Sequence, residues 1–332
     1  PFLNESSDSS NLYFVNGLME STLNNLQRIE DLRVTSRTSS EKFRNSKQSI
    51  PEIAEELKVR YLIEGSGQKI GNQIKLHIQL IDALEDKPLW TEEYHREWGD
   101  IFDLQEEIAE QISKSIKVLI SPQERAQIAK RPTQNLKAYD YYLKALDPYF
   151  ERSPESLKLA ISLFDSAITE DPKFALAYAD MAIAYYLLDL NHKEKSYTEQ
   201  INKFSDQALL YDSKSDVSLI AKACYYLQVA DYRLALPHLE KALEYNPNSV
   251  AAIHMLSDYY AYHDPNTGKY LEYALKGVRL DAIGRDSITS SYSYLQLSNA
   301  LVQAGFFKEA LHYVNRSLAY YPKNYYSPHL KI

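Results

Sequence analysis

The sequence contains one cysteine, Cys224, among its 332 residues. A single thiol excludes an intramolecular disulfide and a zinc site built from several cysteines, and it suits either the cytoplasm or a bacterial periplasm. The eight histidines are scattered, and none stands at a spacing typical of metal ligands. The sequence therefore predicts no bound metal ion, and no motif in it indicates another cofactor.

Long apolar segments and clusters of basic residues are also missing. No apolar run approaches the roughly 18 residues of a membrane-spanning helix, and no signal peptide opens the chain. The formal net charge is −8, without a Lys/Arg cluster of the kind that follows a phosphate backbone. No G-x-S-x-G motif occurs, and the carboxylates in the helices are typical of solvated surfaces. We therefore expect no nucleic-acid binding by this portion and no enzyme activity.

Glycine is scarce, but three of the nine glycines fall in the stretch EGSGQKIGNQIKLHIQL (residues 64–80). A phosphate-binding loop would need a helix immediately after the glycines. Instead, apolar and polar residues alternate over residues 74–80, which is the period of a strand with one buried face. The sequence favours a β-hairpin that turns at Gly71, with Gly65 and Gly67 serving a bulge or a close backbone approach. The phosphate-binding loop remains the alternative.

The first part of the chain switches between the periods of helices and strands. Helices are predicted in LYFVNGLMESTLNNLQRI, in IPEIAEELKV with Ser49 as N-cap, and in DIFDLQEEIAEQISKSIKVLI. The apolar stripe of this last helix consists of Ile101, Leu104, Ile108, Ile112, Ile116 and Leu119. Strands are predicted in LRVTSR, in LWTEEYHREW and in both arms of the hairpin, and PFLNE is expected to be the end of a further strand. This alternation predicts a two-layer α/β domain over residues 1–120.

After a polar linker at residues 121–134, only helical periodicity remains, and it repeats. The segments FDSAITEDP, SDQALLYDS, LEKALEYNP, LKGVRLDA and VNRSLAYYP align on a small residue, at spacings of 41, 34, 35 and 40 residues. These small residues are Ala167, Ala208, Ala242, Gly277 and Ser317. A period of ~34 residues is the signature of tetratricopeptide (TPR) repeats, in which small residues let two helices touch. The sequence predicts an all-α TPR superhelix, a helical repeat solenoid of four to five repeats, over residues 135–332, with insertions near NHKEKSY and AIGRDS.

The first helices of TPR repeats line the concave face of the array, and the register predicts which residues lie there. The predicted ligand- or partner-binding residues are Ile183, Tyr186, Ile220, Cys224, Leu227, His254, Asp258, Tyr292, Leu295 and Asn299. Tyrosine combines an apolar ring with a hydrogen-bonding tip, which suits peptides or sugars, although it can equally fill contacts between helices. His254 and Asp258, four residues apart, either share a ligand or form an exposed polar pair.

The segments YFVNGLMESTLNNLQRIEDLRVTSRTSS, IAEELKVRYLIEGSGQKIGNQIKLHIQLIDA and LWTEEYHREWGDIFDLQEEIAEQI resemble the TolB amino-terminal-like domain. This resemblance covers about residues 1–130, and the repeats account for most of the remaining chain. In the proteins that it resembles, this pair of domains commonly follows an output domain and one transmembrane helix. The output domain is a DNA-binding domain of AraC or winged-helix type, or a cyclase. The first strand in this family is an apolar run ending in Pro-Phe, which implies that more chain precedes Pro1.

The resemblance and the repeats together predict a non-catalytic sensor that binds a ligand or a protein. We expect it to be the periplasmic portion of a bacterial inner-membrane transcription regulator, with a cytoplasmic location as the alternative. The expected occupant of the TPR groove is a peptide, a protein or a small molecule such as a sugar, and the chain also allows a homodimer. A constitutive TPR scaffold, the regulatory region of an adenylate cyclase, and an enzyme built on the first domain are the other hypotheses.

Overall fold

The stretch with three glycines forms the hairpin of a four-stranded sheet. In the computed structural model, which describes residues 1–35, 37–190, 192, 194–281 and 287–321, β2 (Tyr61–Ile70) and β3 (Gln73–Asp82) pair antiparallel around Gly71. Gly71 has a φ of 58°, in the left-handed region that glycine adopts without steric penalty. A Cβ on Gly65 would lie 2.6 Å from the ring of Phe2, so the backbone approach predicted there is confirmed. A strand follows these glycines in place of the helix that a phosphate-binding loop needs.

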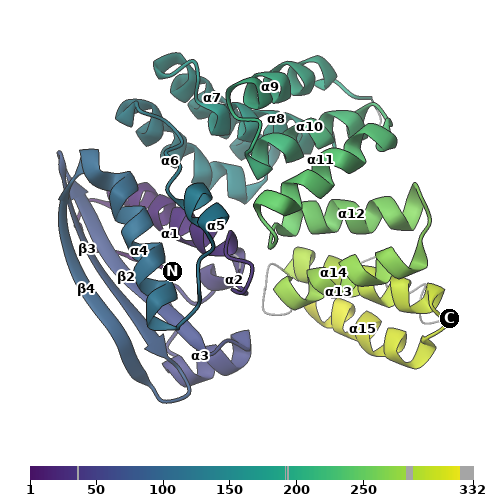
Figure 1. Cartoon of the computed structure of the whole chain (residues 1–332), viewed down its shortest axis with the longest axis horizontal. Helices are drawn as coiled ribbons and strands as arrows, with labels where there is room; N and C mark the ends of the chain where they lie inside the picture. Colours follow the sequence, from purple (N-terminus) through teal and green to yellow (C-terminus); the bar gives the residue numbers. More distant parts are fainter. Residues whose placement is uncertain (36, 191, 193, 282–286, 322–332) are drawn as a thin grey trace.

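The sheet has the order β1-β2-β3-β4 and is covered on one face by helices, as Figure 1 shows. β1 (Leu3–Asn4) runs parallel to β2, and β4 (Lys87–Glu97) runs antiparallel to β3. α1 (Leu12–Gln27) and α4 (Ile101–Ser115) bury their apolar faces on the sheet in one hydrophobic core. Two short helices, α2 (Arg37–Glu41) and α3 (Ile50–Leu57), complete this part of the chain. The predicted two-layer α/β architecture is confirmed.

Two details of the sequence prediction for this domain are wrong. The described part of the LRVTSR segment is not a strand: residues 32–35 have no regular secondary structure and pair with no strand of the described sheet, Ser36 lies outside the described residues, and Arg37 begins α2. The predicted stripe on α4 also extends too far. The helix ends at Ser115, and Lys117 adopts a left-handed φ of 61°, which breaks the helical period before Leu119. Leu119 is consequently 87% exposed.

The remaining chain is helical and forms a repeat solenoid of TPR type, as the spacing predicted (Figure 1). Its helices are α5 (Pro122–Ile128), α6 (Leu136–Glu151), α7 (Pro154–Glu170), α8 (Ala175–Asp189), α9 (Thr198–Tyr211), α10 (Asp216–Gln228), α11 (Tyr232–Tyr245), α12 (Val250–Tyr262), α13 (Thr267–Asp281), α14 (Ser287–Gln303) and α15 (Phe307–Tyr320).

From α6 onward the helices pack as consecutive hairpins, α6 with α7 and so on to α14 with α15. The aligned small residues lie in the second helix of each hairpin. Ala167, Ala208, Ala242 and Ser317 are fully buried there, and a Cβ on Gly277 would lie 3.3 Å from the His254 ring. The insertion predicted at NHKEKSY is the loop between α8 and α9, which the structure describes only in part. The one predicted at AIGRDS begins with residues 282–286, which lie outside the described residues.

The α/β domain and the first repeats share one hydrophobic core. Gly17 on α1 leaves room for Leu143 on α6, whose side chain lies 2.7 Å from the position of an added Cβ. The ring of Tyr139 on α6 packs against Phe102 on α4, with centroids 4.7 Å apart. The segment predicted as a linker, residues 121–134, contains α5, and Ile128 of α5 is buried in the same core. The solenoid is therefore attached to the α/β domain by apolar packing.

Candidate ligand-binding site

The first helices of two neighbouring repeats bring an aspartate, a tyrosine and a glutamine together. Asp258 on α12 accepts hydrogen bonds from the Tyr292 hydroxyl, at 2.6 Å to each carboxylate oxygen, and from Gln296 Nε2 at 2.8 Å. Tyr292 and Gln296 are four residues apart on α14 and so project from the same face of that helix. We call Asp258, Tyr292, Gln296, His254 and Ser293 the Asp258 network.

The histidine of the network lies one turn before Asp258. His254 Nε2 is 2.9 Å from the Ser293 hydroxyl, and the His254 ring contacts Tyr292 edge to face, with centroids 5.8 Å apart. The structure thus brings together three predicted site residues, His254, Asp258 and Tyr292. Both His254 and Asp258 take part in contacts between α12 and α14. That the two residues share a ligand stays a prediction.

Asp258 acts electrostatically on several groups around it. Burial raises its pKa above the usual value for aspartate, against the opposing effect of the hydrogen bonds from Tyr292 and Gln296. Burial and the Asp258 charge together raise the pKa of Tyr292. The same charge contributes to the raised pKa of Tyr186 on α8 and of Tyr270 on α13. Asp258 therefore influences side chains of several repeats electrostatically.

Three of the residues predicted to line an open groove are buried instead. Ile220 and Leu295 are 4% and 5% exposed and Cys224 is fully buried, so these side chains face neighbouring helices in this structure, and a role for them in binding stays a prediction. Ile220 and Cys224 pack with side chains of neighbouring repeats, including Ile183, because adjacent first helices must bury apolar area against one another.

The other predicted residues have different surroundings. Ile183, Tyr186 and Leu227 are half-buried and pack at the edges of apolar clusters, and Asn299 is hydrogen-bonded to Tyr270. Tyr292 is 37% exposed. A role for these side chains in binding stays a prediction.

Sequence reasoning did not identify two further acidic groups. Asp180 on α8 is buried and accepts a 2.8 Å hydrogen bond from the Tyr142 hydroxyl, and burial raises the pKa of Asp180 to about 7. Burial also raises the pKa of Glu20 on α1 to about 7, and the Oε2 atom of Glu20 is buried without a hydrogen-bond partner in the described residues. The detectable signal was one charged residue inside the otherwise apolar stretch ALAYADMAIAYY.

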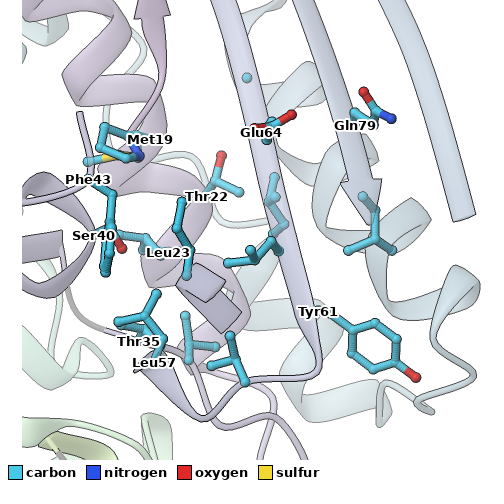
Figure 2. Close-up of a pocket in the computed structure, with 18 of the residues that line it drawn as sticks. Met19, Thr22, Leu23, Thr35, Ser40, Phe43, Leu57, Tyr61, Glu64 and Gln79 are labelled. Atoms are coloured by element: carbon cyan, nitrogen blue, oxygen red, sulfur yellow. The ribbon is translucent and has the colours of Figure 1, made fainter. Parts of the chain in front are cut away.

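The α/β domain contains a cavity, separate from the Asp258 network (Figure 2). This cavity of about 990 Å³ is bounded by α1, by residues 32–35, by α3 and by the first half of β2. Its lining includes Met19, Leu23, Phe43 and Leu57, and Figure 2 shows these side chains around it together with Thr35 and Glu64. The walls are mainly apolar.

Among the residues that the structure describes, no group of three or more His, Cys, Asp or Glu side chains is arranged to hold a metal ion. Within the same residues, no helix combines the length and the apolar composition needed to cross a bilayer.

Comparison with known proteins adds information on the first part of the chain. Residues 1–111 match the HilA/YgeH-like transcriptional regulator, second domain. The matched segment is the α/β domain without the repeats, so it relates this domain to one found in transcriptional regulators. The resemblance to the TolB amino-terminal-like domain stays a prediction.

One curated relative is similar over part of the chain. This protein, "Putative adenylate cyclase 3" of Rhizobium meliloti (strain 1021), is 30% identical over 183 residues. The match covers 55% of the chain but only 31% of the relative's length. The chain thus spans about a third of the protein that it matches.

Solved structures share the repeat architecture. YrrB, described as a TPR protein with an unusual peptide-binding site, is 16% identical with a TM-score of 0.40, over 64% of this chain and 98% of YrrB. MamA from Desulfovibrio magneticus RS-1 is 20% identical with a TM-score of 0.39, over 57% of this chain and 97% of MamA. At this level of identity the likeness concerns the fold alone.

Proposed function

We propose that the chain is the non-catalytic, partner-binding sensor of a membrane-anchored bacterial transcription regulator, located outside the cytoplasm. The observation that supports this proposal most directly is that the α/β domain and the first repeats share one hydrophobic core. A domain similar to one of HilA/YgeH-like transcriptional regulators is packed onto a repeat array with a polar network on its first helices. Repeat arrays of this kind present extended binding surfaces. The polar network supplies hydrogen-bonding groups for a peptide, a protein or a small ligand.

The proposed mechanism is a change in how the array and the α/β domain are held together. α12 carries Asp258, and the residues just before α12 contact the end of α1 through Asn248. A ligand can bind the Asp258 network more tightly in one arrangement of α12 and α14 than in another. Such a ligand shifts the population toward the arrangement to which it binds more tightly. The α/β domain would then transmit the shift to an output domain elsewhere in the protein.

The test is the topology of the parent protein. The gene is sequenced upstream of the codon for Pro1. The parent protein that contains this chain is then fused, within this chain, to alkaline phosphatase or to β-galactosidase. A DNA-binding domain followed by roughly 20 apolar residues, with phosphatase activity and no galactosidase activity, is the expected result. A parent protein without a membrane-spanning segment, or an active galactosidase fusion, would overturn the proposal that this chain is the extracytoplasmic part of a regulator.

A second candidate function is the regulatory region of an adenylate cyclase. The observation that favours it is the 30% identity to the curated relative, whose name is that of an adenylate cyclase. A cyclase domain encoded upstream, with cyclic AMP production by the full-length protein, would select this candidate. The chain would then keep its binding role, and the output would be a nucleotide messenger. A constitutive TPR scaffold would instead retain its partner under all conditions, and its thermal stability would respond to no small ligand.

A further inference from the structure

Charged carboxylates at the surface of this protein commonly pair with lysine or arginine. Asp140 pairs with Lys69 at 2.7 Å, Glu170 with Lys137 at 2.7 Å and Asp206 with Lys222 at 2.6 Å. Such pairs are typical of a protein with both charge signs on its surface. A carboxylate without such a cationic partner is therefore a candidate for binding a cation from outside the chain.

Asp258 is such a carboxylate. Its side-chain hydrogen-bond donors in the described residues, Tyr292 and Gln296, are neutral, and no lysine or arginine of the described ranges forms an ion pair with it. Asp180 has the same character, since its hydroxyl donor is Tyr142. The side chains of Asp189 on α8 and Asp216 on α10 likewise accept hydrogen bonds from neutral groups and form no ion pair among the described residues. These three aspartates are buried, whereas Asp258 is partly exposed and can be reached by a cation from outside the chain.

The groups that face Asp258 give the site a definite chemistry. His254 on its own helix, His263 at the end of that helix and Tyr186 on α8 all interact electrostatically with it. Burial lowers the pKa of His263, so this imidazole is mainly neutral at pH 7 and does not supply the missing positive charge. Tyr292, whose hydroxyl donates to the carboxylate, is 37% exposed. A carboxylate next to an exposed aromatic ring attracts cations through both charge and the ring quadrupole.

A second observation concerns Gln296, whose side chain is held on Asp258. Gln296 is 3% exposed, and its Oε1 atom is buried without a hydrogen-bond partner in the described part of the chain. Burying an amide oxygen without a partner is unfavourable, and an ammonium or guanidinium group that enters the network can donate to it. An anionic occupant would instead be repelled by Asp258.

We propose that the Asp258 network binds an organic cation, an ammonium or guanidinium group seated on the Asp258 carboxylate against the ring of Tyr292. This rests on the proposed function, because it names the chemistry of the occupant that the sensor recognises. The same group is available from the lysine or arginine side chain of a peptide and from a free alkylamine. The carboxylate supplies the charge, Tyr292 the aromatic face and Gln296 a further acceptor.

The experiment compares matched probes by isothermal titration calorimetry at low and at physiological salt. The peptide Ac-Ala-Ala-Lys-Ala-Ala-NH2 is tested against the same peptide with an Nε-acetylated lysine, and 1,4-diaminobutane against 1,4-butanediol. The variant is Asp258→Asn, which keeps the shape of the side chain and removes its charge. The control is Asp165→Asn, which makes the same change of charge at an exposed position of α7.

The expected result is binding of the cationic probes only, weakened by salt and weakened about tenfold or more by Asp258→Asn but not by Asp165→Asn. Binding of the lysine peptide alone identifies a polypeptide as the source of the cation, and binding of the diamine alone identifies a small amine. Equal binding of the acetylated peptide or the diol, unchanged binding by Asp258→Asn, or no binding of either cation would overturn the proposal. Failure of the proposed function is seen separately, in the topology of the fusions.

Discussion

The side-chain amide of Asn248 donates a hydrogen bond to the backbone carbonyl of Ile29, over 3.1 Å and across 219 positions of the sequence. The same amide nitrogen lies 3.1 Å from the carbonyl oxygen of Gln27 and 2.9 Å from that of Leu32. These carbonyls follow α1, where the helix end leaves acceptors without intrahelical donors. One side chain from the later repeats thereby caps the end of a helix in the α/β domain. The contact therefore joins the α/β domain to the loop between α11 and α12, in addition to the core that it shares with the first repeats.

Replacing Asn248 should loosen this connection without unfolding the repeats. Asn248→Ala removes the amide, and we expect the free energy of unfolding to fall by about 1 kcal/mol because these partly buried carbonyls lose a hydrogen bond. Hydrogen exchange at residues 27–32 should increase in the same variant. Asn315→Ala, at an exposed position of α15, is the control. Unchanged exchange at residues 27–32 would contradict a capping role for Asn248.

Stability should fall as the pH rises toward 7, because of Glu20 and Asp180. The pKa of each is raised in the folded state to about 7, so the folded protein binds more protons than the unfolded chain between about pH 4.5 and 7. Their contribution is therefore most favourable at low pH and is lost as the pH rises through the folded pKa. Glu20→Gln and Asp180→Asn, compared with the wild type in urea unfolding from pH 5 to 8, should flatten this dependence. A parallel dependence in all three proteins would show that these two groups do not cause it.

The close packing at Gly65 predicts a large effect from one methyl group. Gly65→Ala places a Cβ 2.6 Å from the Phe2 ring, and we expect a loss of about 1–3 kcal/mol in the free energy of unfolding because the ring or the strand must move. Gly99→Ala is the matched control, since a Cβ at Gly99 has no heavy atom within 4 Å. Its effect should stay within about 0.5 kcal/mol. Equal losses of unfolding free energy at both positions would contradict the close packing of the Phe2 ring against Gly65 on β2.

The single thiol should be unreactive until the solenoid opens. Cys224 is fully buried, and burial raises its pKa to about 12, so almost none of it is thiolate at pH 8. We expect no reaction with a disulfide reagent under native conditions and rapid reaction in denaturing urea. The reaction rate at intermediate urea then reports opening of the contact between α8, α10 and α12. Fast labelling of the native protein would mean that this part of the array opens readily.

Sequence patterns predicted those helices, strands and turns that depend on residues close together in the chain. The alternation after Gly71 predicted the hairpin, and Ser49 as N-cap predicted the start of α3. The residues 32–35 could not be placed in the same way, because β pairing depends on a neighbouring strand that the pattern does not contain. Leu119 fits the period of α4, yet the left-handed Lys117 ends that period first.

The repeat period likewise predicted the solenoid, since each repeat buries its apolar face against the next, and it assigned His254, Asp258 and Tyr292 to the first helices. Tertiary structure decided which of those positions are open. Cys224 and Ile220 are covered because adjacent first helices approach closely, whereas Asp258 meets Tyr292 and Gln296 across a helix boundary. Only the folded chain brings Asn248 to the end of α1 and Glu20 toward Asp180. The sequence by itself determined the elements and their order, because these follow from contacts between near neighbours. The polar network and the contacts between the two parts arise from packing between distant segments, which no local pattern specifies.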